Sequence, residues 1–291
     1  MKLLLHIGFH KTGTTFLQST FQNNRELLEK KGLYYPSHGS FSNSKGEAIS
    51  GHDKLVEGAI LGKGVKELLP DMDKPISSVM LSAENLTHPF SPYKLEMFLD
   101  SKFCGDEIWE QIIILVSYKH PNKMISSHYL EVMLNGVNKR HLFYSDFIKL
   151  KKHQLERMLY NTNKRKGVKF IPFHSTSIIG DLSQCDVIPE INDTSFSIDN
   201  AIAYKSPKVE SFVDFYNVKN INRINPVLPY LKLVNENFKN DFCINDFEDV
   251  NYKLLSISPG FKDKVIFKIN YFVIIFNGIK NYCVYKLGMK Y

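Results

Sequence analysis

Cysteine is scarce in this chain of 291 residues, and its four cysteines stand far apart with no CxxC pair. Neither a zinc knuckle nor a dense disulfide framework is therefore indicated, and we expect a reduced, cytoplasmic compartment. No run of apolar residues approaches the roughly 20 needed to cross a bilayer, and the run from Leu3 to Leu5 is too short for a signal peptide. The sequence also has no internal repeat.

The histidines lack the spacing of a metal site. His6, His10, His38 and His88 form no HExxH motif and no pair at ligand spacing along the chain. We therefore expect no metal cofactor.

Positive charge is in excess, with 37 Lys plus Arg against 30 Asp plus Glu and a net charge of +7. Such a balance favours an anionic partner, for example a phosphate, an acidic polysaccharide or a lipid headgroup. No nucleic-acid-binding motif is present, so we do not expect nucleic acid as the partner. Hydrophobic residues at 43% and charged residues at 23% are typical of a globular protein and exclude wholesale disorder.

Apolar periodicity predicts alternating strands and helices. Short apolar runs at residues 2–9, 77–82, 111–117 and 168–173 predict buried strands, and helical patterns at 14–31, 52–69, 92–99, 122–134 and 146–159 separate most of them. This order predicts an α/β fold, a P-loop-like three-layer sandwich with a central, mainly parallel sheet. We expect one domain over residues 1–260, in which 175–251 form a helical and loop extension over the sheet.

The last segment, residues 261–291, is a basic and aromatic tail. Its apolar and aromatic side chains are interrupted by Lys264, Lys268, Lys280, Lys286 and Lys290. The pattern fits either a last helix packed on the core or a helix that lies on a membrane surface.

The string from Leu5 to Gln18, LHIGFHKTGTTFLQ, places a glycine-containing loop between a buried strand and a helix. A turn at Gly13 lets successive backbone N–H groups point at one spot, and the helix N-terminus adds positive potential there. Lys11 adds a cation, and three threonines add hydroxyl donors: Thr12, Thr14 and Thr15. The loop suits a phosphate or sulfate group, but it is no Walker A motif, because no Lys follows Gly13.

The string HIGFHKTGTTFLQ resembles the 5′-phosphosulfate loop of sulfotransferases that use 3′-phosphoadenosine 5′-phosphosulfate (PAPS), in particular bacterial and carbohydrate enzymes with a KTGTT loop. The resemblance implies that the cofactor is held by the loop residues His10, Lys11, Thr12, Gly13, Thr14 and Thr15. In that family Lys11 would also neutralise charge on the bridging oxygen as the sulfuryl group leaves.

A second segment, IIILVSYKHPNKMISSHY, resembles the part of these enzymes that binds the 3′-phosphate of the cofactor. Lys119 stands where the family usually has Arg at a strand end, and Ser127 stands eight residues later on the following helix. A cation and a hydroxyl can converge there on one dianion, although Lys lacks the bidentate fork of Arg.

Two residues are candidates for the base that accepts the proton of the acceptor hydroxyl. Glu84, in SSVMLSAENL, lies where the family places its base, and His52, in SGHD, follows the polar loop 37–51. An ionised carboxylate can accept a proton from an alcohol as the bond to sulfur forms. The sequence leaves both open as catalytic residues.

The resemblance implies an enzyme that moves a sulfuryl group from PAPS to a carbohydrate hydroxyl, with adenosine 3′,5′-bisphosphate (PAP) as the second product. The acceptor would be a cell-surface glycan or its lipid-linked precursor, and the tail could bring the enzyme to the inner membrane face as a peripheral protein. Two alternatives remain, a P-loop small-molecule kinase and a non-catalytic protein that binds a phosphonucleotide or glycan.

Overall fold

The computed structural model describes residues 1–37, 41–42, 48–49, 51–63, 69–70, 75–88, 91, 93–118, 124–125, 127–129, 144–174, 227–238 and 261–287. Its centre is a five-stranded sheet in the order β2-β5-β1-β6-β7. The strands are β1 (Lys2–His6), β2 (Leu33–Tyr34), β5 (Ser78–Ser82), β6 (Gln111–Tyr118) and β7 (Val168–His174). A separate antiparallel pair joins β3 (Phe41–Ser42) to β4 (Ala48–Ile49), within the segment expected as a loop.

Every pairing in the large sheet is parallel. The first strand, β1, lies in the middle, with Leu3 opposite Val79 of β5 and Ile112 of β6. The chain leaves β1 towards β2 at one edge, returns to β5, and then crosses β1 to reach β6 and β7. The predicted α/β fold with a parallel sheet is therefore confirmed.

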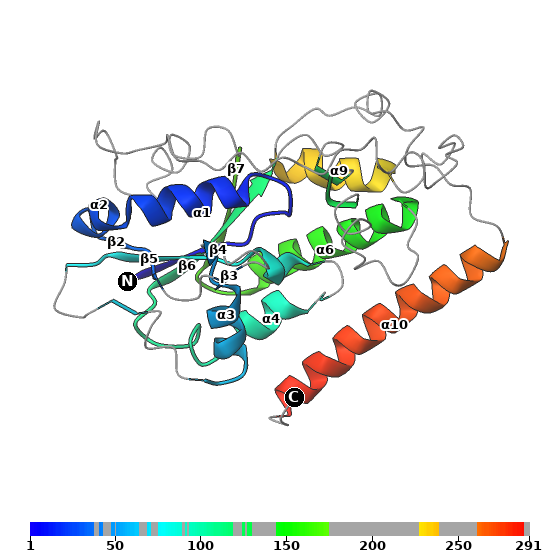
Figure 1. Ribbon diagram of the computed structural model, residues 1–291. Helices are drawn as coiled ribbons and strands as arrows, with labels where there is room; N and C mark the ends of the chain where they lie inside the picture. Colours follow the sequence, from blue (N-terminus) through cyan, green and yellow to red (C-terminus); the bar gives the residue numbers. More distant parts are fainter. Residues whose placement is uncertain are drawn as a thin grey trace.

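Successive side chains of a strand point to opposite faces of the sheet, and helices bury both faces. Leu4 of β1 packs with Leu17 and Phe21 of α1 (Thr14–Asn23) and with Leu28 of α2 (Arg25–Lys30). Leu3 and Leu5 pack on the other side, in a larger core that contains side chains of four helices. These helices are α3 (Asp53–Ile60), α4 (Lys94–Leu99), α6 (Tyr144–Lys164) and α9 (Val227–Phe238). Figure 1 shows α1 and α2 on one face of the sheet and α3 and α4 on the other.

The single helix expected over residues 14–31 is divided at Asn24. This residue leaves the helical conformation at φ −110° and ψ 16°, and its side-chain Nδ2 donates to the Thr20 carbonyl at 2.8 Å. An Asn side chain that bonds the backbone in this way competes with the continuing helix. The second helix, α2, then ends just before Gly32, which has the left-handed φ of 84° that favours glycine.

The last helix, α10 (Phe261–Lys286), lies along the outside of the molecule (Figure 1). It packs on α6 through Ile274 and Leu150, and its Tyr282 ring stacks on Tyr93 beside α4 at 5.7 Å between centroids. Within the described residues, we find no helix with the length and apolar character to cross a membrane. Most of segment 175–251 lies outside the described residues, so its expected role as an extension stays a prediction.

One carboxylate joins α10 to the rest of the protein. Asp100, directly after α4, accepts from Lys286 Nζ at 2.6 Å and from the Tyr282 hydroxyl at 3.0 Å, and it also pairs with Arg165. The far side of α10 stays exposed, with Phe272 at 69% and Phe276 at 56% of their full accessible area.

Candidate functional site

The candidate site lies at the carboxyl ends of β5, β1 and β6, the three adjacent strands in the middle of the sheet. The connection after β1 leads to one side of the sheet, towards β2, and the connection after β5 leads to the other side, towards β6. Ligands of open parallel sheets bind at the point where the strand order reverses in this way. The loop after β1, residues 7–13, is held against β6, because Phe9 donates its N–H to the Ser117 carbonyl at 3.3 Å. The sequence predicted this loop as the binding element.

Two left-handed residues shape the loop. Gly13 has φ 94° and caps α1, and Lys11, at φ 69°, has a conformation that a residue with a Cβ rarely adopts. No side chain caps the N-terminus of α1, and both Gly13 and Thr15 are exposed there. The Thr14 hydroxyl is buried and has no hydrogen-bond partner within the described residues. Donors at the start of α1 therefore face the same end of the sheet as Lys11.

A glycine is also required earlier in the loop. Gly8 has φ 48°, and a Cβ at this position would lie 2.9 Å from the Thr14 hydroxyl. The loop thus passes close to the first turn of α1, and a side chain at residue 8 would push Thr14 away.

A buried chain of hydrogen bonds runs beneath the loop and joins the ends of all three strands. Gln18 Nε2 donates to Ser82 Oγ (3.0 Å), which donates to His6 Nδ1 (2.8 Å). On the other side of the ring, His6 Nε2 donates to Ser117 Oγ (3.2 Å). Ser117 Oγ then donates to Thr12 Oγ1 (2.5 Å), which donates to the Phe9 carbonyl (2.5 Å). Because the Thr12 hydroxyl donates to the carbonyl, each group upstream must donate in turn, and neutral His6 carries its hydrogen on Nε2.

This chain gives Thr12 and His6 structural roles. The Thr12 side chain is fully buried and its hydroxyl is engaged inside the protein, so Thr12 can contribute to a ligand through its backbone. Burial lowers the pKa of His6 to about 3, which keeps the imidazole neutral in the chain. The sequence alone assigns no role to His6, Gln18, Ser82 or Ser117, because each is an ordinary strand or helix residue until the strands are aligned.

Glu84, one of the two candidate bases, lies beside the loop. It opens the short 3₁₀ helix η2 (Glu84–Thr87) after β5, and its Oε2 lies 3.6 Å from His10 Nδ1. Thr87 fastens η2 to the loop, because its hydroxyl lies 3.1 Å from the Ile7 carbonyl and 3.2 Å from that of Gly8. The Glu84 side chain is partly exposed and keeps 27% of its accessible area.

His52, the other candidate base, is held by backbone groups on both ring nitrogens. Nδ1 accepts the N–H of Ser82 at 3.0 Å, so Nε2 carries the hydrogen and donates to the Pro36 carbonyl at 2.9 Å. The side chain is 1% exposed, and burial is the main cause that lowers its pKa to about 4. This arrangement leaves no lone pair for a substrate proton, so the geometry favours Glu84.

Of the two residues expected at the 3′-phosphate, the structure describes Ser127 and not Lys119. Ser127 lies on a helical segment after β6, directly before His128, and is half-buried. Lys119 lies outside the described residues. The convergence of these two side chains therefore stays a prediction.

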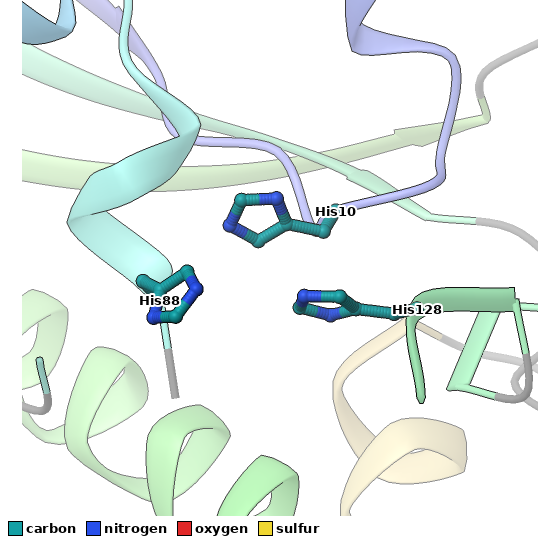
Figure 2. Close-up of side chains that lie close together, drawn as sticks. All are labelled: His10, His88 and His128. Atoms are coloured by element: carbon teal, nitrogen blue, oxygen red, sulfur yellow. The ribbon is translucent and has the colours of Figure 1, made fainter. Parts of the chain in front are cut away.

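Three histidines meet at this edge although the sequence separates them widely. His10 lies in the loop, His88 follows η2, and His128 follows β6, and their rings face one another (Figure 2). Burial, followed by the charge of Lys151, lowers the pKa of each of His88 and His128, and the same two causes act on His10. The expectation of no metal depends on the spacing of histidines along the sequence. That spacing carries no information about His10, His88 and His128, which come from three separate segments.

Lys151 of α6 is a further buried residue at the site. It is 1% exposed, its Nζ donates to Gln154 Oε1 at 3.1 Å, and it lies over the Phe9 ring at 5.5 Å from the centroid. Burial lowers its pKa to about 7, and the charge of Glu84 opposes that shift. In the sequence, Lys151 reads as one of several lysines on an amphipathic helix, so only the fold reveals it.

The sequence matches no protein-family model and no curated protein sequence. Two solved structures are similar. One is the sulfotransferase domain of the olefin synthase from Synechococcus PCC 7002, with 12% identity, a TM-score of 0.43, and cover of 83% of this chain and 95% of that chain. The other is a sulfotransferase from Alicyclobacillus acidocaldarius, with 16% identity, a TM-score of 0.37, and cover of 83% and 97%. Scores and identities this low do not establish a shared fold, so the fold assignment rests on the sheet itself.

Proposed function

We propose that this protein is a sulfotransferase that moves a sulfuryl group from PAPS to a hydroxyl of a carbohydrate. The observation that supports it is the KTGTT loop between β1 and α1, with Lys11 and the uncapped start of α1 at the crossover point of a parallel sheet. A loop of this form binds a phosphate or sulfate group through backbone N–H groups and one cation. The carbohydrate acceptor rests on the resemblance of the loop alone.

In the proposed reaction the acceptor oxygen attacks sulfur and forms a new S–O bond. The bond from sulfur to the bridging oxygen of the donor breaks, and PAP leaves with the electron pair. Glu84 takes the proton of the acceptor hydroxyl, and Lys11 stabilises the negative charge that develops on the bridging oxygen. The position of Glu84 beside the loop, 3.6 Å from His10 Nδ1, supports this role.

Calorimetric titration with PAP, and with adenosine triphosphate in parallel, tests the donor. We expect tight binding of PAP that weakens at least tenfold in Lys11→Ala and Ser127→Ala, because each removes a phosphate contact. Lys30→Ala is the matched control, since Lys30 is exposed at the end of α2. Binding of the triphosphate without PAP would instead support a kinase, and PAP binding without any sulfuryl transfer to glycans would support a non-catalytic binding protein.

We also propose that α10 places the protein on an anionic membrane surface. The exposed side of α10 carries Ile269, Phe272, Val273, Phe276 and Ile279. Two exposed lysines, Lys268 and Lys280, lie on the same helix. Apolar side chains can enter the headgroup boundary while lysines meet anionic lipids.

Co-sedimentation with lipid vesicles tests this contact. We expect binding to vesicles that contain anionic lipid, weaker binding to purely zwitterionic ones, and loss of binding in the double variant Phe272→Ser, Phe276→Ser. Leu61→Ser is the control, because Leu61 is also exposed, at 49%, but belongs to the end of α3 and not to α10. Equal binding of both variants would contradict the proposal.

A further inference from the structure

The three histidines at the carboxyl edge of the sheet form a compact cluster. One ring nitrogen from each of His10, His88 and His128 lies within 4.8 Å of one from each of the others. The ring centroids are 4.4 Å apart for His10 and His128, 5.3 Å for His10 and His88, and 6.2 Å for His88 and His128. Figure 2 shows the three rings, which belong to three different segments, lying close together.

Two of these rings have buried nitrogens without a partner. Within the described residues, His10 Nε2 and His128 Nδ1 make no hydrogen bond and are shielded from solvent. A buried polar atom left unpaired destabilises the folded state, so such atoms usually have a function or a ligand. Two of them in one cluster indicate that a ligand completes it.

We propose that His10, His88 and His128 bind a divalent first-row metal cation such as Zn²⁺. Imidazole nitrogen is a preferred ligand of zinc, and three protein ligands leave a fourth position for water or a substrate oxygen. Zn–N bonds of about 2.0–2.1 Å place two tetrahedral ligand atoms about 3.3 Å apart. The three nitrogens lie within 4.8 Å of one another, so the imidazoles would have to move closer together to reach that separation.

Neighbouring groups are arranged as around known zinc ligands. Glu84 Oε2 lies 3.6 Å from His10 Nδ1, so the carboxylate favours the hydrogen on Nδ1 and leaves the lone pair of Nε2 for the metal. The hydroxyl of Thr87 ties η2 to the loop backbone, so His88, directly after η2, is held near His10.

The positive charge of Lys151 opposes the binding of a cation by the three histidines. It interacts electrostatically with all three histidines, while its Nζ donates to Gln154 Oε1. Replacement by the similarly shaped but uncharged Met should therefore strengthen metal binding. The cluster does not depend on the proposed sulfotransferase activity, although His10 directly precedes Lys11, and a bound metal would hold this part of the loop.

The test uses the full chain, stripped with a chelator and then titrated with Zn²⁺ by calorimetry and with Co²⁺ by visible absorption. We expect one equivalent to bind, cobalt to give the strong d–d bands of a low-coordinate site, and affinity to fall at least tenfold in both His88→Gln and His128→Gln. Lys151→Met should bind more tightly. His153→Gln is the control, because His153 lies on α6 outside the cluster and should bind as the unaltered protein does.

Circular dichroism of each variant shows whether it folds. His88 is only partly buried, so His88→Gln serves as the deciding variant if His128→Gln fails to fold. Absence of Zn²⁺ and Co²⁺ binding in the unaltered protein would overturn the proposal. Equal affinity in a folded His88→Gln variant would overturn it too, since the metal would then bind elsewhere.

Discussion

The hydroxyl of Thr12 lies 2.5 Å from the hydroxyl of Ser117 and so joins the loop between β1 and α1 to the end of β6. Through this contact the loop becomes the last member of a buried hydrogen-bond chain that begins on α1 and passes through His6. The conformation of the loop is thus coupled to the alignment of three strands.

Ser117→Ala should destabilise the fold and weaken PAP binding together. The variant removes the acceptor of His6 Nε2–H, and a buried unsatisfied donor costs about 1–3 kcal/mol. Urea unfolding measures the loss, and calorimetry measures PAP binding. Ser19→Ala, on α1 and only half-buried, is the control and should change neither. Full stability in Ser117→Ala would show that the chain does not support the loop.

Stability should fall in acid because of His52. Its folded pKa is about 4 against an ordinary 6.5, so its contribution is complete above pH 6.5 and decreases as the pH falls towards 4. One such histidine adds a slope of up to about 1.4 kcal/mol per pH unit in this window. Urea unfolding between pH 7.5 and 4.5, chosen to span roughly that window, should show a shallower slope for His52→Gln. An unchanged slope would contradict the assignment.

Asp53 should act with the opposite sign. Burial raises its pKa to about 6 from 3.8, so the folded state takes up a proton first as the pH falls, which partly offsets the loss from His52. Asp53→Asn removes this offset, and the variant should lose stability more steeply between pH 6 and 4 in the same unfolding series. A curve parallel to that of the unaltered protein would contradict the expectation.

Lys11→Gly and Lys11→Ala should separate backbone strain from charge. Both remove the cation and should weaken PAP binding equally, but at φ 69° glycine avoids the strain of a Cβ. We expect Lys11→Gly to be about 1 kcal/mol more stable than Lys11→Ala by thermal unfolding. Equal stability would mean that the loop relaxes when Lys11 is replaced.

Glu84→Gln should lower turnover by about a hundredfold or more while PAP affinity stays unchanged, because the amide cannot take the acceptor proton. Steady-state transfer from PAPS to a glycan, beside calorimetry, measures both. Glu57→Gln is the control, since Glu57 is an exposed carboxylate on α3. A Glu84→Gln variant with full turnover would exclude Glu84 as the base.

Asp100→Ala should release α10 from the body of the protein. The carboxylate accepts from Lys286 and Tyr282 on α10 and pairs with Arg165 next to β7. Limited proteolysis should cut within α10 about tenfold faster, which corresponds to about 1.4 kcal/mol of lost anchoring. Asp106→Ala, an exposed carboxylate in a turn, should leave the rate unchanged.

Local signals were enough to find the loop and the sheet. The glycine and threonine cluster after an apolar run places Lys11 and Gly13 between a strand and a helix. The apolar runs of β5 and β6 can be recognised as strands from their own residues, without knowing which strands they pair with. The division of the first helix at Asn24 was not predicted, because one Asn within an apolar pattern is a weak signal until its side chain bonds Thr20.

The sequence by itself determined the parallel α/β fold and the position of the loop between β1 and α1, because the apolar periodicity, the glycines and the start of a helix are properties of a few neighbouring residues. Only the tertiary structure decided that His52 is held by backbone groups, that His6 links Ser82 to Ser117, and that three histidines form one cluster. These relationships join residues far apart in the chain. They exist only after the strands pair in register and their carboxyl ends meet at one edge of the sheet.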